Sequence, residues 1–158
     1  MSKQDTIPRS FFTRLRNDRS GVAAVELGLT APVLAGLLIP MVDLGMGSYQ
    51  KMRVQDAAEA AAQYALAHAS SYNSSAIQTA GQNATSLSGV TVTPSNSCNC
   101  LTGSTIGPAV SCTSTCSDGS TPGTFVSVAT SVSYTTLVAY PGISSPMTLT
   151  GYAIVRTK

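Results

Sequence analysis

The chain has 158 residues, of which only 10% are charged, and its net charge is +2. This length allows one modest domain plus an additional element. The charge is unevenly divided, because five basic and two acidic residues precede Val22, whereas four basic and five acidic residues lie from Val22 onward. A nucleic-acid-binding protein needs a basic face on its folded domain, so this distribution argues against a nucleic-acid partner.

Residues 1–21 form a basic leader in front of an apolar run. Basic residues that flank a membrane span stay in the cytoplasm, so we expect a cytoplasmic N-terminus and an external C-terminal part. The run Leu27–Val42 is uncharged, and with the apolar residues on either side it approaches the roughly 20 residues of a membrane helix. We therefore expect a transmembrane and assembly helix over 22–48, with a helix hydrogen bond missing at each of Pro32 and Pro40.

Three kinds of processing fit such a beginning. A secretory signal peptide would need a small-x-small cleavage site soon after the run, but the first Ala-x-Ala is Ala58-Glu-Ala60, which is too far away. A permanent anchor would not be cut at all. Cleavage after Gly21 would make Val22 the first residue and Glu26 the fifth. A basic leader, a glycine and an apolar helix with glutamate at its fifth position form the prepilin signature.

The segment from Gly21 to His68 resembles the TadE-like pseudopilins and minor pilins of the tight-adherence (Tad, or Flp) pilus system. The resemblance is carried by GVAAVE at 21–26, APVL at 31–34, VDLG at 42–45 and the alanine-rich stretch at 54–64. LGL at 27–29 and Pro40 depart from the pattern that the family usually shows. The resemblance implies that a membrane prepilin peptidase removes the leader and that the chain takes part in assembling a pilus for adhesion.

The resemblance also implies partners and a location. The expected partners are the prepilin peptidase, other pilin or pseudopilin subunits and the inner-membrane assembly machinery. The expected location is the bacterial inner membrane, in a single pass with the C-terminal domain outside, followed by incorporation into the extracellular pilus. A second hypothesis from a different class is a permanently anchored outer domain that binds a partner and is neither cleaved nor polymerised.

Two acidic residues in or near the apolar run are candidate assembly residues. A carboxylate in hydrocarbon costs several kcal/mol unless it is paired. Cleavage after Gly21 would give Glu26 a partner in the new Val22 amine, either in the same chain or in a neighbouring subunit. Asp43 has two interpretations: it marks the outer boundary of the membrane, or it pairs with a neighbouring subunit.

The remaining sequence predicts an α+β, pilin-like fold, in which a long N-terminal helix packs on a small antiparallel sheet. Helix formers continue the helix outside the membrane over 49–83, although serine and asparagine after His68 favour a break there. The small residues of this stretch form either a solvated face or a packing seam. Residues 84–158 form the β domain, since valines alternate with polar residues around 90–92, 126–134 and 147–155.

Four cysteines are expected in a cysteine-rich loop of the β domain, before its long strand: Cys98, Cys100, Cys112 and Cys116. Neither close pair has the Cys-x2-Cys spacing of a zinc site. In an external compartment an even number of cysteines indicates disulfides, so we expect two, in one of three possible pairings. The sequence contains one histidine, His68, and no recognisable catalytic, cofactor-binding or metal motif. We therefore expect a structural protein that is the substrate of an enzyme and not an enzyme itself.

Overall fold

The computed structural model describes residues 20–158, and residues 1–19, which hold most of the basic leader, lie outside the described residues. The described chain divides into two compact units, one ending at Val42 and the other running from Asp43 to Lys158. A single helix, α2 (Ser20–Ala67), contributes to both. Each unit is described by itself below.

The first unit is the apolar part of α2, and its side chains from Gly21 to Met41 are exposed or, at Pro40, half-buried. The helix continues through both Pro32 and Pro40. A proline clashes with the carbonyl of the residue four positions earlier, and here those residues are Gly28 and Gly36. The carbonyl groups of these two residues have lost their helix hydrogen bond, and glycine adds no side chain next to them. Another molecule can therefore approach these carbonyl groups.

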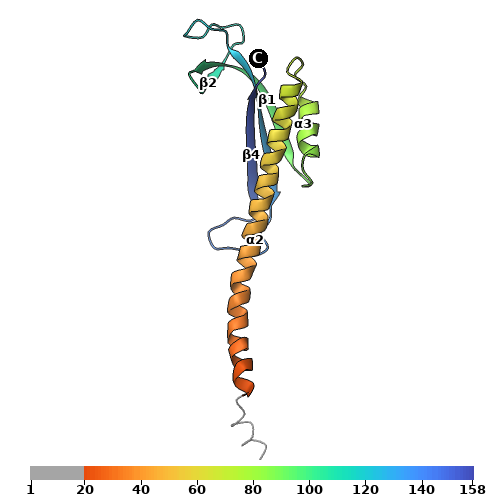
Figure 1. Cartoon of the computed structure of the whole chain (residues 1–158), viewed down its shortest axis with the longest axis vertical. Coiled ribbons are helices and arrows are strands. Elements are labelled where there is room, and N and C mark those ends of the chain that lie inside the picture. Colours follow the sequence, from red (N-terminus) through yellow and green to blue (C-terminus); the bar gives the residue numbers. More distant parts are fainter. Residues whose placement is uncertain (1–19) are drawn as a thin grey trace, which may run out of the picture. The chain divides into compact units, whose positions relative to one another are not determined.

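The second unit is an α+β domain, which confirms the predicted fold class. Four antiparallel strands form one sheet in the order β2-β1-β3-β4. Their bounds are β1 (Thr91–Thr102), β2 (Thr105–Val110), β3 (Gly123–Tyr134) and β4 (Met147–Arg156). The part of α2 that belongs to this unit packs along the sheet, and a short helix, α3 (Ser74–Asn83), lies beside its last turns (Figure 1).

The alanine-rich part of α2 is a packing seam and not a solvated face. Its fully buried residues are Val54, Ala57, Ala58 and Ala61. Across from them, the residues that the alternation placed on one face of β3 are buried, and Val128 is fully buried. The hydroxyl of Thr130 donates a 2.8 Å hydrogen bond to the Val54 carbonyl, which joins the strand to the helix backbone.

Glycine allows the closest approach between α2 and the sheet. A Cβ placed on Gly151 would lie 2.6 Å from Oγ1 of Thr130 and 2.7 Å from the carbonyl oxygen of Val54. On the neighbouring helix, a Cβ on Gly81 would lie 3.0 Å from the Ala57 carbonyl oxygen. Gly151 therefore allows β4, and Gly81 allows α3, to lie close to the backbone of α2.

The predicted helix over 49–83 is present as two helices. The chain leaves the helix after Ala67, and α3 begins after Asn73, whose side chain accepts a hydrogen bond from the Ala76 amide. This N-cap explains the break, because asparagine at that position satisfies an otherwise unpaired amide of α3. The serine- and asparagine-rich stretch therefore allows α3 to fold back onto α2 and Val92.

Candidate processing and assembly site

The predicted cleavage junction lies within the first described turn of α2, whose described part begins at Ser20. Nothing outside the local helix backbone lies within 4 Å of a Cβ built on Gly21, and Val22 is 63% exposed. Among the described residues nothing therefore covers this junction. Within residues 20–158, a Cβ at position 21 therefore meets no steric obstacle.

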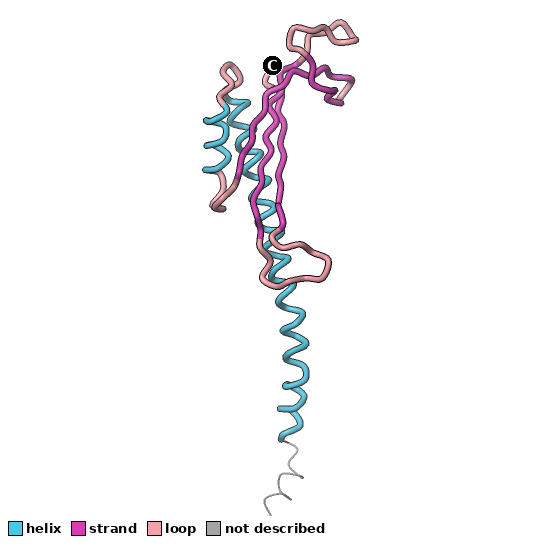
Figure 2. The backbone as a smooth tube through the Cα atoms, turned by 180° about the vertical axis from the view of Figure 1, so that it is seen from behind, coloured by secondary structure: helices cyan, strands magenta, loops and turns pink. Residues whose placement is uncertain are grey.

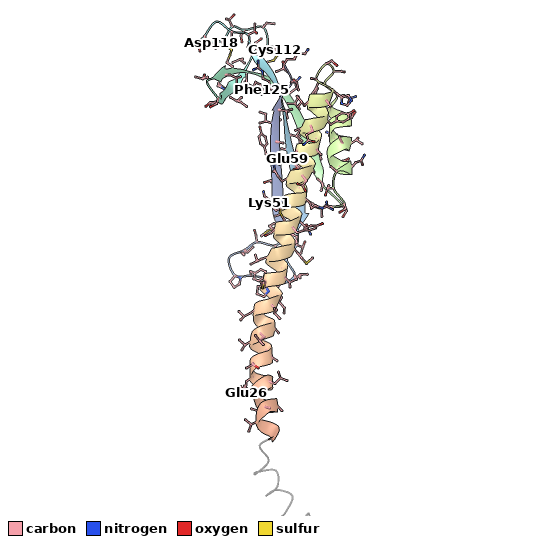
Figure 3. The ribbon with its side chains drawn as sticks, in the orientation of Figure 1. Glu26, Lys51, Glu59, Cys112, Asp118 and Phe125 are labelled. Atoms are coloured by element: carbon pink, nitrogen blue, oxygen red, sulfur yellow. A yellow bond between two sulfur atoms is a disulfide. The ribbon has the colours of Figure 1, made fainter. Side chains whose placement is uncertain are left out.

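Glu26 is exposed on the apolar part of the helix, where Figure 3 labels it. Within residues 20–158 its carboxylate has no hydrogen-bond or ion-pair partner, while its backbone oxygen accepts a 2.9 Å bond from the Thr30 hydroxyl. Glu26 lies six residues after Ser20, the first described residue of α2. The structure thus leaves the side chain free to meet a group that the described chain does not provide.

The helix that carries Glu26 is long and apolar enough to cross a membrane, with a mean hydropathy of 2.0 over its best window and none of that window buried. Residues 22–42 would extend about 32 Å as a helix, close to the roughly 30 Å hydrocarbon core of a bilayer. The most exposed side chains here are large and aliphatic, including Met41 at 72% and Leu29 at 70%. Such a surface requires either lipid or protein around it.

Asp43, the first residue after this run, is only 2% exposed, unlike its neighbours on the helix. Its carboxylate accepts a hydrogen bond from the Tyr134 hydroxyl and a 3.0 Å bond from the Leu137 amide. The Tyr134 oxygen also lies 3.0 Å from the backbone carbonyl oxygen of Asp43. The buried acid is thus compensated within its own chain, by the end of β3 and the loop that follows it.

Two tyrosines complete the surroundings of Asp43. The hydrogen bond to Asp43, together with burial, raises the pKa of Tyr134 to about 12. Burial, with the Asp43 carboxylate as the second cause, also raises the pKa of Tyr140. Both phenols therefore keep their protons at physiological pH, and Tyr134 remains a hydrogen-bond donor to the acid. An apolar groove of about 260 Å³ lies next to them, lined by residues of α2, the β3–β4 loop and β4.

The structure bears differently on the two interpretations of Asp43. Asp43 is buried immediately after the apolar run, and it bonds to the loop that follows β3. Both observations support its interpretation as a boundary residue. Pairing with a neighbouring subunit stays a prediction. Hydrogen bonds within its own chain already compensate the buried carboxylate. Residue spacing could not indicate that Tyr134 and Leu137 bind Asp43, because they lie more than 90 positions away. The only indication in the sequence was that the alternation over 126–134 places Tyr134 on the inward face of its strand.

All four cysteines are paired, as Cys98–Cys112 and Cys100–Cys116, with Cα–Cα distances of 5.1 and 5.7 Å. The prediction of two disulfides is confirmed, and the structure selects one of the three pairings. Cys98 and Cys100 lie on β1 and not in a loop, since β1 is longer than expected and β2 was not predicted. The two bonds join the segment that follows β2 to β1.

Few groups in the described part of the chain could support catalysis. No cluster of three or more metal-ligating side chains occurs within residues 20–158. His68 is exposed near the end of α2 and stacks on Tyr64, with ring centroids 4.1 Å apart, as expected for a surface residue. Asp118 accepts hydrogen bonds from the side chain and the amide of Ser120, which lower its pKa and close a tight turn.

The comparisons with known proteins bear on the apolar and alanine-rich segment. The model of the TadE-like protein family matches residues 21–63. The match begins at the glycine of the predicted junction and extends over Glu26, Asp43 and the packing seam. Neither a curated protein nor a solved structure matches the chain. The TadE-like resemblance is confirmed over these residues, and it associates the chain with the Tad pilus system.

Proposed function

Because residues 21–63 are TadE-like, we propose that this chain is a structural pseudopilin or minor pilin that takes part in assembling a Tad-type pilus for adhesion. The observation that carries the proposal is the combination of that match with an apolar helix whose side chains are exposed. A subunit of a packed bundle of helices requires such a surface. The protein acts by assembly and not by catalysis.

The proposed maturation step is removal of residues 1–21 by a prepilin peptidase. The junction between Gly21 and Val22 is supported as a cleavage site by its open surroundings and by the start of the family match at Gly21. Glycine has no side chain to obstruct an extended fit into a protease site. The cut is on the cytoplasmic side of the span, and the mature protein begins with the helix itself.

Cleavage supplies the partner that Glu26 lacks. The new amine of Val22 is positive at neutral pH. Glu26 then becomes the fifth residue of a helix that starts at the cut, close enough to the N-terminus for the helix dipole to favour its charge. In a bundle of such helices, the Val22 amine of one subunit docks against Glu26 of its neighbour. An unpaired charge away from water costs several kcal/mol, so this pair favours correctly staggered neighbours.

The proposed location is the inner membrane of a bacterium, in a single pass through residues 22–42 with the Asp43–Lys158 unit outside. Disulfides in that unit agree with an external compartment. The partners are the prepilin peptidase, other pilin or pseudopilin subunits and the assembly machinery of the inner membrane. From the membrane the subunit enters the extracellular pilus.

The assembly role is tested by Glu26→Gln, which removes the charge and keeps the shape. We expect the variant to be inserted and cut after Gly21 but to co-purify poorly with its partner subunits and to give fewer pili. Glu59→Gln is the matched control, because Glu59 is an exposed acid on the same helix outside the span. If Glu26→Gln is cleaved, associates and supports pili as the control does, Glu26 is not an assembly residue.

A further inference from the structure

The loop 135–146 between β3 and β4 is held in a defined conformation. Its Leu137 amide bonds to Asp43, and its Thr136 amide donates a 3.1 Å bond to the Ser145 hydroxyl. The Ile143 amide bonds to the Tyr140 carbonyl across Pro141 and Gly142, and Gly142 has a φ of 83°. Proline followed by glycine at positive φ is the pattern of a type II turn. The loop thus presents its side chains from a fixed backbone.

Those side chains are apolar and exposed. Leu137 is 63% exposed, Ile143 is 43% exposed and Val138 is 42% exposed. The loop contains no charged residue, and none occurs anywhere between Asp118 and Arg156. Moving this loop out of water therefore involves no desolvation of a side-chain charge, and it removes several large aliphatic groups from contact with water.

The loop lies at the end of the sheet where the chain enters the outer unit. Asp43 directly follows the apolar run, and it bonds to the backbone of this loop. Figure 2 shows the loop at the end of β3 and β4 that lies away from the β1–β2 hairpin. The first seven helix residues after Asp43 are also uncharged and include exposed Leu44, Met46 and Tyr49. Lys51, the next charged residue, comes about 12 Å further along the helix.

We propose that the loop 135–146 inserts its apolar side chains into the outer leaflet of the membrane, at the boundary between headgroups and acyl chains, before the subunit joins a pilus. This inference rests on the proposed membrane span, because the span fixes which end of the domain meets the bilayer. Interfacial apolar segments typically enter about 5–10 Å into that boundary.

Lipid accounts for these features better than a second copy of the chain does. The uncharged band includes both the loop and the first turns of α2 after Asp43, and these turns directly follow the apolar run in the sequence. The Asp43 carboxylate would be costly so close to hydrocarbon, but Tyr134 and the loop itself cover it. The loop therefore compensates the Asp43 carboxylate through the Leu137 amide, and it also carries exposed aliphatic side chains.

The chain has no tryptophan, so a single introduced tryptophan reports its own surroundings. The full-length chain is reconstituted into phosphatidylethanolamine–phosphatidylglycerol vesicles whose acyl chains are brominated either near the headgroup or near the bilayer centre. The reporter variant is Ile143→Trp. Leu66→Trp is the control for an exposed leucine elsewhere in the domain, and Leu34→Trp reports on the span.

We expect Ile143→Trp to lose most of its fluorescence to the shallow bromine and less to the deep one, while Leu66→Trp is quenched by neither. Leu34→Trp should be quenched by bromine at both depths. If Leu34→Trp is quenched but Ile143→Trp behaves like Leu66→Trp, the span stands and the loop proposal is wrong. Protection of Ile143→Trp from both lipid bromine and aqueous acrylamide would indicate a protein neighbour and also overturn it. If Leu34→Trp is not quenched, the span fails and the loop proposal fails with it.

Discussion

The Tyr134 hydroxyl, at the end of β3, donates a hydrogen bond to the buried carboxylate of Asp43, the first residue after the apolar run. This contact joins residues 91 positions apart and fixes where the outer unit begins. The carboxylate therefore lies within the fold of the Asp43–Lys158 unit. The first residue of that unit is held by the end of its own sheet.

Tyr134→Phe removes this donor and keeps the ring. We expect a lower thermal midpoint for the full-length protein in detergent, because a buried carboxylate loses one of its two compensating hydrogen bonds. Tyr152→Phe is the matched control, since Tyr152 is 56% exposed on β4. The melting of both variants is followed by circular dichroism. Equal midpoints for the two variants would show that the Tyr134–Asp43 contact does not stabilise the domain.

Gly151→Ala tests the close approach of β4 to α2. The added Cβ would lie 2.7 Å from the Val54 carbonyl oxygen, so the helix and the strand must move apart. We expect a loss of about 1–3 kcal/mol in the free energy of unfolding, as is typical of overpacking. Gly45→Ala is the control, because Gly45 lies on α2 and a Cβ built there would meet open space. A Gly151→Ala protein as stable as this control would mean that the contact is not tight.

The disulfides are tested by peptide mapping of the unreduced protein. We expect peptides joined as Cys98–Cys112 and Cys100–Cys116, and no alkylation before reduction. Each bond closes a loop of about 15 residues, and replacing a pair with serine should cost roughly 2–4 kcal/mol. Four alkylated thiols in the native protein, or a different pairing, would contradict the structure.

Gly21→Leu tests the proposed cleavage site. Because no described residue outside the local helix lies within 4 Å of a Cβ at Gly21, we expect a folded protein that keeps its full length in the membrane. Gly28→Leu is the matched control, since Gly28 is equally open in the same helix and lies beyond the junction. Immunoblotting of membrane fractions separates the cut and uncut forms. Cleavage of Gly21→Leu at the normal rate would show that the peptidase does not require this glycine.

The sequence predicts most of this fold because its periodicities are strong. The alternation of Val126, Val128 and Val132 placed β3 with its buried face correctly, whereas the small residues of α2 left a solvated face and a packing seam open until the fold showed the seam. The strand β2 was missed, because its residues carry no alternation and are all exposed except half-buried Gly107. Pro94 within β1 also weakened the strand pattern there.

The site was predicted only where its residues are neighbours in sequence. Gly21, Val22 and Glu26 form a local pattern that residue spacing alone can reveal. The partners of Asp43 come from β3 and the loop after it, and only the folded sheet brings them to the helix. The pairing of the cysteines likewise depends on the register of β1 against β2, which composition does not determine.

The most direct test of the proposed maturation is to measure the intact mass and the N-terminal sequence of the protein purified from its native membrane. We expect a chain that begins at Val22, with the four cysteines oxidised in two disulfides. A chain that keeps Met1 would instead indicate a permanently anchored domain, and an N-terminus beyond the apolar run would indicate a cleaved signal peptide. Either of those two results would contradict the proposed maturation and the assembly role of Glu26 that depends on it.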